Sequence, residues 1–81
     1  MKGVDSSGLQ VAFGEVIRDL RHRAGLSQEE LSFRCNRHRT YVSLIERGRN
    51  APSIVTLWLL AAALDVTPSE IARATELRFT P

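Results

Sequence analysis

The sequence contains few of the residues that carry thiol or metal chemistry. Cys35 is its single cysteine, so the chain cannot form an internal disulfide framework. Together with the absence of a signal peptide, this favours a protein of the reducing cytoplasm. The two histidines, His22 and His38, do not form a spaced ligand set with Cys35. We therefore expect no metal site and no cofactor.

Long apolar runs are also missing. The longest largely apolar stretch, residues 54–64, is far shorter than the ~20 residues that a membrane-spanning helix needs, so we expect no membrane association. At 81 residues, 43% of them hydrophobic, the chain has the composition of one small domain that folds unaided. No Ser/His/Asp set or carboxylate pair falls on plausible adjacent elements, so we expect no enzyme, and no room remains for a domain that senses a small-molecule ligand.

The net charge of +2 is mild, but the charges are unevenly distributed. Five arginines fall between residues 34 and 49, where residue 46 is the sole acid. A run of cations usually marks only a solvated surface. Here it coincides with the apolar spacing of a short helix, in which Val42 and Ile45 point inward. The pattern indicates a helix that is buried on one side and cationic at both ends.

Periodicity and capping residues predict an all-α chain. Residues 1–8, with two glycines and two serines, are expected to be a flexible N-terminal tail, and a first helix is expected from Leu9 to a stop at Gly25. Ser27 to Glu30 and Thr67 to Glu70 fit the capping-box pattern at the start of a helix. Further helices are expected at about residues 28–35, 39–47, 54–64 and from 68 toward 77.

The second and third helices are short and joined by a tight turn. Asn36 tolerates a positive φ and can end the second helix, and His38 stands at the N-cap of the third. Two such helices, the second with small polar and cationic residues exposed, match a helix-turn-helix. The second helix of that motif fits the major groove of DNA.

Residues 26–71 resemble the phage-repressor and Cro-like helix-turn-helix family, often called XRE-like. The resemblance rests on four segments: Gly-Leu-Ser-Gln-Glu-Glu-Leu, Arg-Thr-Tyr-Val-Ser, Ile-Glu-Arg-Gly and Pro-Ser-Ile. It implies a compact five-helix, lambda-repressor-like DNA-binding domain over residues 9–78. It also implies a homodimer, made through the fourth and fifth helices, that binds an inverted repeat in double-stranded DNA.

The resemblance implies two groups of DNA contacts. An arginine at the start of the recognition helix can hold guanine with two hydrogen bonds. Arg39 could instead contact a phosphate. Leu44 could pack against a neighbouring loop instead of contacting DNA. Base contacts are expected from Arg39, Thr40, Ser43 and Leu44. Phosphate contacts are expected from Gln28, Arg37, His38, Tyr41, Arg47, Arg49 and Asn50. Tyr41 should pack its ring on the domain and leave its hydroxyl free.

Other residues are given architectural roles. The resemblance pairs Arg21 of the first helix with Glu46 at the end of the third, which would fix the recognition helix against the scaffold. The Asn36-Arg37 pair departs from the family's usual glycine and apolar residue, and Arg37 is either an extra phosphate contact or solvent-exposed. Cys35 is interpreted as a small buried hydrophobe.

The fourth helix is apolar on nearly all sides. Its inward row is expected to be Ile54, Leu57, Leu60, Ala61 and Leu64. A second row is formed by Val55, Trp58, Leu59 and Ala62. Either the C-terminal helix or a second subunit could cover this row, and family precedent favours a symmetric dimer interface.

The resulting hypothesis is a sequence-specific transcriptional regulator, either a repressor or a restriction-modification controller protein. Two alternatives stay open. One is a protein-interaction module or antitoxin-type protein that binds a partner through the face of Trp58. The other is the DNA-binding part of a larger regulator.

Overall fold

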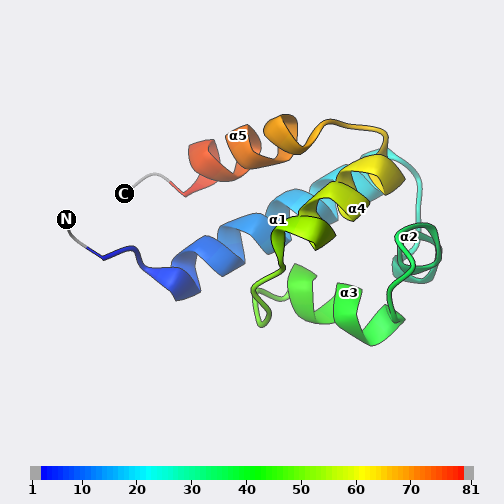
Figure 1. Ribbon diagram of the computed structural model, residues 1–81, viewed down its shortest axis with the longest axis horizontal. Coiled ribbons are helices and arrows are strands. Elements are labelled where there is room, and N and C mark those ends of the chain that lie inside the picture. Colours follow the sequence, from blue (N-terminus) through cyan, green and yellow to red (C-terminus); the bar gives the residue numbers. More distant parts are fainter. Residues whose placement is uncertain (1–2, 80–81) are drawn as a thin grey trace.

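The chain folds into five α-helices, which is the all-α architecture that the sequence predicts. The computed structural model describes residues 3–79, and no strand occurs among them. The helices are α1 (Ser6–Arg23), α2 (Gln28–Arg34), α3 (Arg39–Glu46), α4 (Ile54–Leu64) and α5 (Pro68–Arg78). The long helix α1 packs against α3, α4 and α5, and α5 and α3 lie on opposite sides of it (Figure 1).

The first helix begins earlier than expected. Asp5 is its N-cap, and the Asp5 carboxylate accepts a hydrogen bond from the amide of Gly8 at 3.1 Å. The expected tail of residues 1–8 is therefore wrong for residues 6–8, whereas residues 1–2 lie outside the described part. The glycine and serines suggested a flexible segment, but an aspartate placed before them caps a helix well.

The core draws on all five helices. Ile17, Leu31, Ile45, Leu60 and Ile71, one from each helix in chain order, are at most 1% exposed. Cys35 is buried in the same cluster, which confirms its interpretation as a small hydrophobe. Burial raises the pKa of the Cys35 thiol above its ordinary value, because the thiolate would be poorly solvated there.

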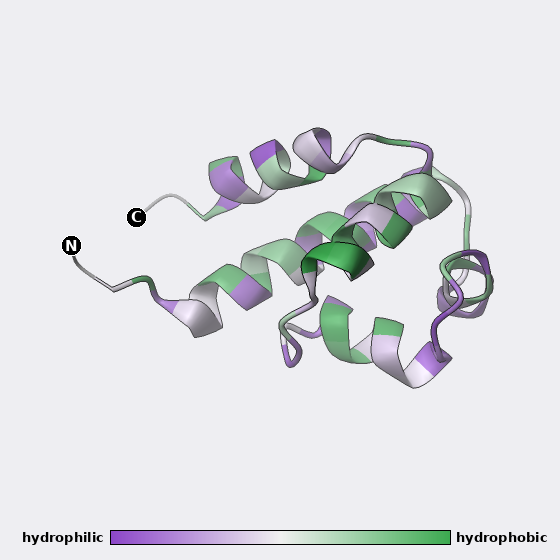
Figure 2. Ribbon diagram, viewed as in Figure 1, coloured by the Kyte–Doolittle hydropathy of each residue, from purple (hydrophilic) through white to green (hydrophobic). Residues whose placement is uncertain are grey.

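The buried face of α4 differs from the predicted row at its first turn. Ile54 is 66% exposed, and Thr56 is buried in its place. Thr56 is accommodated because its hydroxyl lies within hydrogen-bonding distance of Ser53 and Tyr41. Farther along, Leu60, Ala61 and Leu64 are buried as predicted. Figure 2 shows that hydrophobic residues extend along most of α4, so the exposed part of this helix is also apolar.

A close crossing of α1 and α3 depends on Gly14. A Cβ atom at Gly14 would lie 2.2 Å from the carbonyl oxygen of Ile45 and 2.9 Å from that of Glu46. Both obstacles are backbone atoms, so no side-chain rotation can relieve the clash. Glycine thus lets the end of the recognition helix approach the scaffold closely.

Candidate nucleic-acid interface

Local sequence signals place α2 and α3 in a helix-turn-helix arrangement. Ser27 and Glu30 form the predicted capping box at the start of α2. The backbone amide of Ser27 lowers the pKa of the Glu30 carboxyl, since it donates a hydrogen bond to the ionised form. Asn36 adopts the predicted positive φ of 55°, and the amide of Arg37 then bonds back to the carbonyl of Ser32. These bonds fix the turn between the two helices.

The start of α3 is capped by a histidine. Nδ1 of His38 accepts a hydrogen bond from the amide of Thr40 at 3.0 Å, which confirms His38 as the N-cap. Val42 and Ile45 are buried as expected, and the opposite side of α3 faces outward. Arg39 and Thr40 are exposed, whereas Ser43 and Leu44 are half-buried. The four residues predicted to contact bases therefore share the outer side of one helix.

Arg21 and Glu46 form the predicted ion pair, and both are buried, at 8% exposure each. Arg21 donates from Nε and Nη2 to the two carboxylate oxygens at 2.7 and 2.9 Å, and from Nη1 to the carbonyl of Leu26. The hydrogen bonds to Glu46 raise the pKa of the guanidinium, against the opposing effect of burial. This bidentate contact fixes the end of α3 against α1.

Gln28 and Tyr41 are held by the protein itself. The Gln28 amide donates to Oε1 of Glu46 at 3.1 Å, so this side chain buttresses the recognition helix. Its contact with a phosphate stays a prediction. The Tyr41 ring is half-buried against the core, but its hydroxyl is not free: it donates to Oγ1 of Thr56 at 3.4 Å. This bond was not predicted, because the inward row expected for the fourth helix did not include Thr56.

The cations and the asparagine predicted to contact phosphates lie around the two ends of α3. Arg37 donates to the carbonyl of Asn36, and Arg47 donates from Nε to the carbonyl of Ser43. Arg49 is exposed and Asn50 half-buried in the loop that follows. The phosphate contacts assigned to this group stay predictions, but their positions flank the outward side of α3.

Three contributing residues were not expected from the sequence. Gly14 allows the close approach of α1 and α3, Thr56 holds the Tyr41 hydroxyl, and Glu29 pairs with Arg39 at 3.8 Å. Only Gly14 had a usable signal, because a glycine inside a strongly periodic helix costs ~1 kcal/mol and often marks close packing. The other two depend on contacts between helices.

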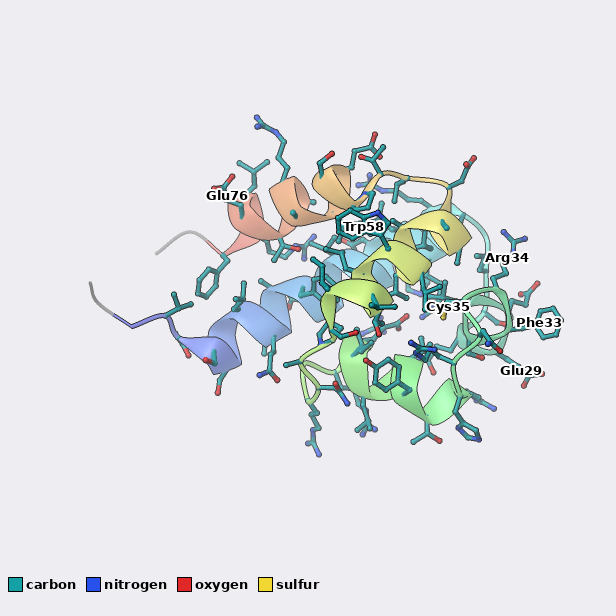
Figure 3. All side chains as sticks on the ribbon, viewed as in Figure 1. Glu29, Phe33, Arg34, Cys35, Trp58 and Glu76 are labelled. Carbon is teal, nitrogen blue, oxygen red and sulfur yellow. The ribbon has the colours of Figure 1, made fainter. Side chains whose placement is uncertain are left out.

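The second apolar row of α4 is largely uncovered. Val55 and Trp58 are 59% and 57% exposed, Ala62 is exposed and Leu59 is half-buried. The C-terminal helix α5 packs mainly against α1, so no described segment covers Trp58, which Figure 3 labels on α4. A separate apolar cleft of about 570 Å³ is lined in part by Phe13, Ile54 and Phe79, and by no residue of the second apolar row.

Comparison with known proteins identifies the fold and its family. A family model described as "Helix-turn-helix" matches residues 17–71, which include α2, α3 and α4. The chain belongs to the helix-turn-helix family. This confirms the XRE-like resemblance and the prediction of a DNA-binding regulator.

Similar proteins include restriction-modification controller proteins. The control protein C.BamHI of Bacillus amyloliquefaciens is 36% identical over 67 residues, which are 82% of this chain and 83% of that protein. The controller protein C.AhdI from Aeromonas hydrophila, known from a crystal structure, is 45% identical in sequence to this chain. The two structures match with a TM-score of 0.75, over 76% of this chain and 94% of that one. The controller protein C.Esp1396I has been solved as a tetramer in complex with its natural 35-base-pair operator. A chain of that structure is 30% identical in sequence to this one and matches it with a TM-score of 0.80, over 88% of this chain and 93% of that one.

Among residues 3–79, no single helix is long and apolar enough to cross a membrane, although α4 and α5, which are bent by 104° at the break between them, together have that length and composition. The same residues contain no group of three or more His, Cys, Asp or Glu side chains that could hold a metal ion.

Proposed function

We propose that the protein is a sequence-specific transcriptional regulator that inserts α3 into the major groove of duplex DNA. The observation that carries the proposal is the outward first turn of α3, where Arg39 and Thr40 are exposed while Val42 and Ile45 are buried. The ion pair of Arg21 and Glu46 holds this helix rigidly enough to read base edges.

The protein acts as a homodimer on an inverted repeat. The row of Val55, Trp58, Leu59 and Ala62 supplies a largely exposed apolar patch on α4. Large exposed apolar patches mark interaction surfaces. A two-fold dimer through α4 and α5 would present two copies of α3 to two half-sites about one helical turn apart. The C.Esp1396I complex, a tetramer on its operator, is an assembly of comparable kind.

The chain acts as a controller or a repressor. C.BamHI is named a control protein and C.AhdI a restriction-modification controller protein, and both align over most of this chain. These likenesses support the controller role. The gene that the protein regulates, and whether transcription rises or falls, would follow from the position of the operator relative to the promoter.

Selection of bound sequences from random duplex DNA tests the proposal. The purified wild-type protein should enrich an inverted repeat with half-sites about one helical turn apart. Its affinity for that repeat should fall steeply as salt rises, because cations around α3 displace counterions from phosphates. Absence of both an enriched sequence and salt-dependent binding would overturn the proposal.

A protein-interaction module is the second candidate function, and the exposure of Trp58 favours it. In that case a different protein would occupy the apolar row of α4, and α3 would bind no DNA. Measuring the affinity for duplex DNA at several salt concentrations distinguishes the two candidate functions. A protein-interaction module should show no salt-dependent affinity, whatever its oligomeric state.

A further inference from the structure

Glu29 lies beside the arginine on which base reading is proposed to depend. It is the second residue of α2, Arg39 is the first residue of α3, and Oε2 of Glu29 is 3.8 Å from Nη1 of Arg39. Figure 3 shows Glu29 on the outer side of α2, with Phe33 and Arg34. The ion pair therefore joins the first turns of the two helices at the surface that would face DNA.

The pair contributes little to the stability of the fold. The side chains of Arg39 and Glu29 are 65% and 78% exposed, and ion pairs this exposed are usually worth ~0–1 kcal/mol. Its main effect is on the position of the guanidinium. Without a partner, a long exposed arginine samples many rotamers, whereas a carboxylate at this distance favours those that keep Arg39 beside α2.

The contact leaves Arg39 able to hold a base. Glu29 approaches Nη1, so the edge formed by Nε and Nη2 remains for another acceptor pair. The same edge of Arg21 holds both carboxylate oxygens of Glu46 within this protein. Guanine presents O6 and N7 to an arginine edge in the same two-bond manner. One guanidinium can thus contact Glu29 and guanine together.

We propose that Glu29 is a positioning residue that sets sequence specificity through Arg39. On a site with guanine, the ion pair persists and holds the guanidinium toward the base. On other DNA, Arg39 reaches a phosphate only by breaking the pair, and the Glu29 carboxylate itself repels phosphates. Glu29 therefore weakens binding to wrong sequences more than binding to the operator. This inference rests on the proposed function.

Substitution Glu29→Gln tests the inference because it removes the charge and keeps the shape. Affinity is measured by fluorescence anisotropy for the selected operator, for that operator with the guanine pair read by Arg39 replaced, and for random duplex. Glu29→Gln should bind the last two more tightly. The affinity ratio between the two operators should fall about two- to fivefold, the range that exposed ion pairs support.

Glu30→Gln is the matched control. It changes the net charge by the same amount one residue away, but the Glu30 side chain is bonded to the Ser27 amide and glutamine preserves that cap. General attraction to DNA should rise in this variant, and the ratio between the two operators should stay at its wild-type value.

An Arg39→Ala background shows whether Glu29 acts through Arg39. Adding Glu29→Gln to Arg39→Ala should leave the operator ratio unchanged. The inference is overturned if Glu29→Gln alone keeps the wild-type ratio, or if it lowers the ratio equally in both backgrounds, as a direct contact of Glu29 with cytosine would. If the wild-type protein prefers no sequence at all, the proposed function fails first and the inference falls with it.

Discussion

At the residue scale, the ion pair of Arg21 and Glu46 holds the end of α3 against α1. Both are buried, and Gln28 is a second side-chain donor to the Glu46 carboxylate, beside Arg21. Among the described residues no buried side-chain nitrogen or oxygen lacks a hydrogen-bond partner. Removal of one member would leave a buried charge without its counter-charge, which costs more than the intact pair contributes.

Arg21→Met should lower the free energy of unfolding by about 3–5 kcal/mol, because Glu46 is left buried and unpaired. The double variant Arg21→Met, Glu46→Leu should recover most of that loss. Urea denaturation followed by circular dichroism measures both values. Arg23→Met, an exposed arginine of the same helix, is the control and should change stability by less than about 0.5 kcal/mol. Equal losses in the Arg21 and Arg23 variants would contradict this account.

Gly14→Ala should destabilise the protein by about 1–3 kcal/mol, although alanine favours helices. The added Cβ would lie 2.2 Å from the backbone oxygen of Ile45, and neither helix can move without disturbing the core. Gly3→Ala is the control, since a Cβ atom at Gly3 would meet nothing within 4 Å. Thermal unfolding compares the two. A Gly14→Ala variant as stable as wild type would show that the helices can separate freely.

At the element scale, the turn between α2 and α3 depends on a left-handed residue. Asn36 has a φ of 55°, which asparagine and glycine tolerate and β-branched residues do not. Asn36→Gly should keep stability within about 1 kcal/mol of wild type, whereas Asn36→Val should lose about 1–2 kcal/mol or more. Urea denaturation of the two variants checks this. If Asn36→Val were as stable as Asn36→Gly, backbone conformation would not limit the turn.

The elements were predictable where their signals are local. Four features depend only on residues within four positions of one another: the capping boxes at Ser27 and Thr67, the positive φ of Asn36 and the N-cap at His38. All four occur as predicted. The start of α1 was missed because the glycine and serines after Asp5 outweighed the cap that Asp5 provides.

The site was less predictable because its contacts cross between helices. The pair of Arg21 and Glu46 followed from the family resemblance, not from periodicity. The burial of Thr56 and its bond to Tyr41 depend on how α3 meets α4, and Glu29 reaches Arg39 only because the turn brings two helix starts together. No pattern in one sequence encodes the angles between helices.

At the scale of the whole molecule, the exposed row of α4 carries the expected dimer. Trp58 is the sole tryptophan, so its fluorescence reports on the environment of this surface. Dilution through the dissociation range should shift its emission to longer wavelength as the indole enters water. Sedimentation should show Trp58→Ala as a monomer at concentrations where wild type is a dimer, since tryptophan often anchors interfaces.

Phe33→Ala is the control for that experiment. Phe33 is also an exposed aromatic residue, at 87%, but it lies on α2, away from the apolar row of α4. This variant should sediment as wild type does. Dimers of equal strength in the wild-type and Trp58→Ala proteins would place the interface elsewhere on the surface.

The most direct test of the central claim is selection from random duplex DNA by wild type and Arg39→Ala side by side. The account predicts that wild type enriches an inverted repeat and that Arg39→Ala loses the preference at one position in each half-site, a change of about 1–3 kcal/mol there. Loss of affinity that is uniform across all sequences would contradict base reading by Arg39. Enrichment of no sequence by wild type would contradict the claim that α3 reads DNA.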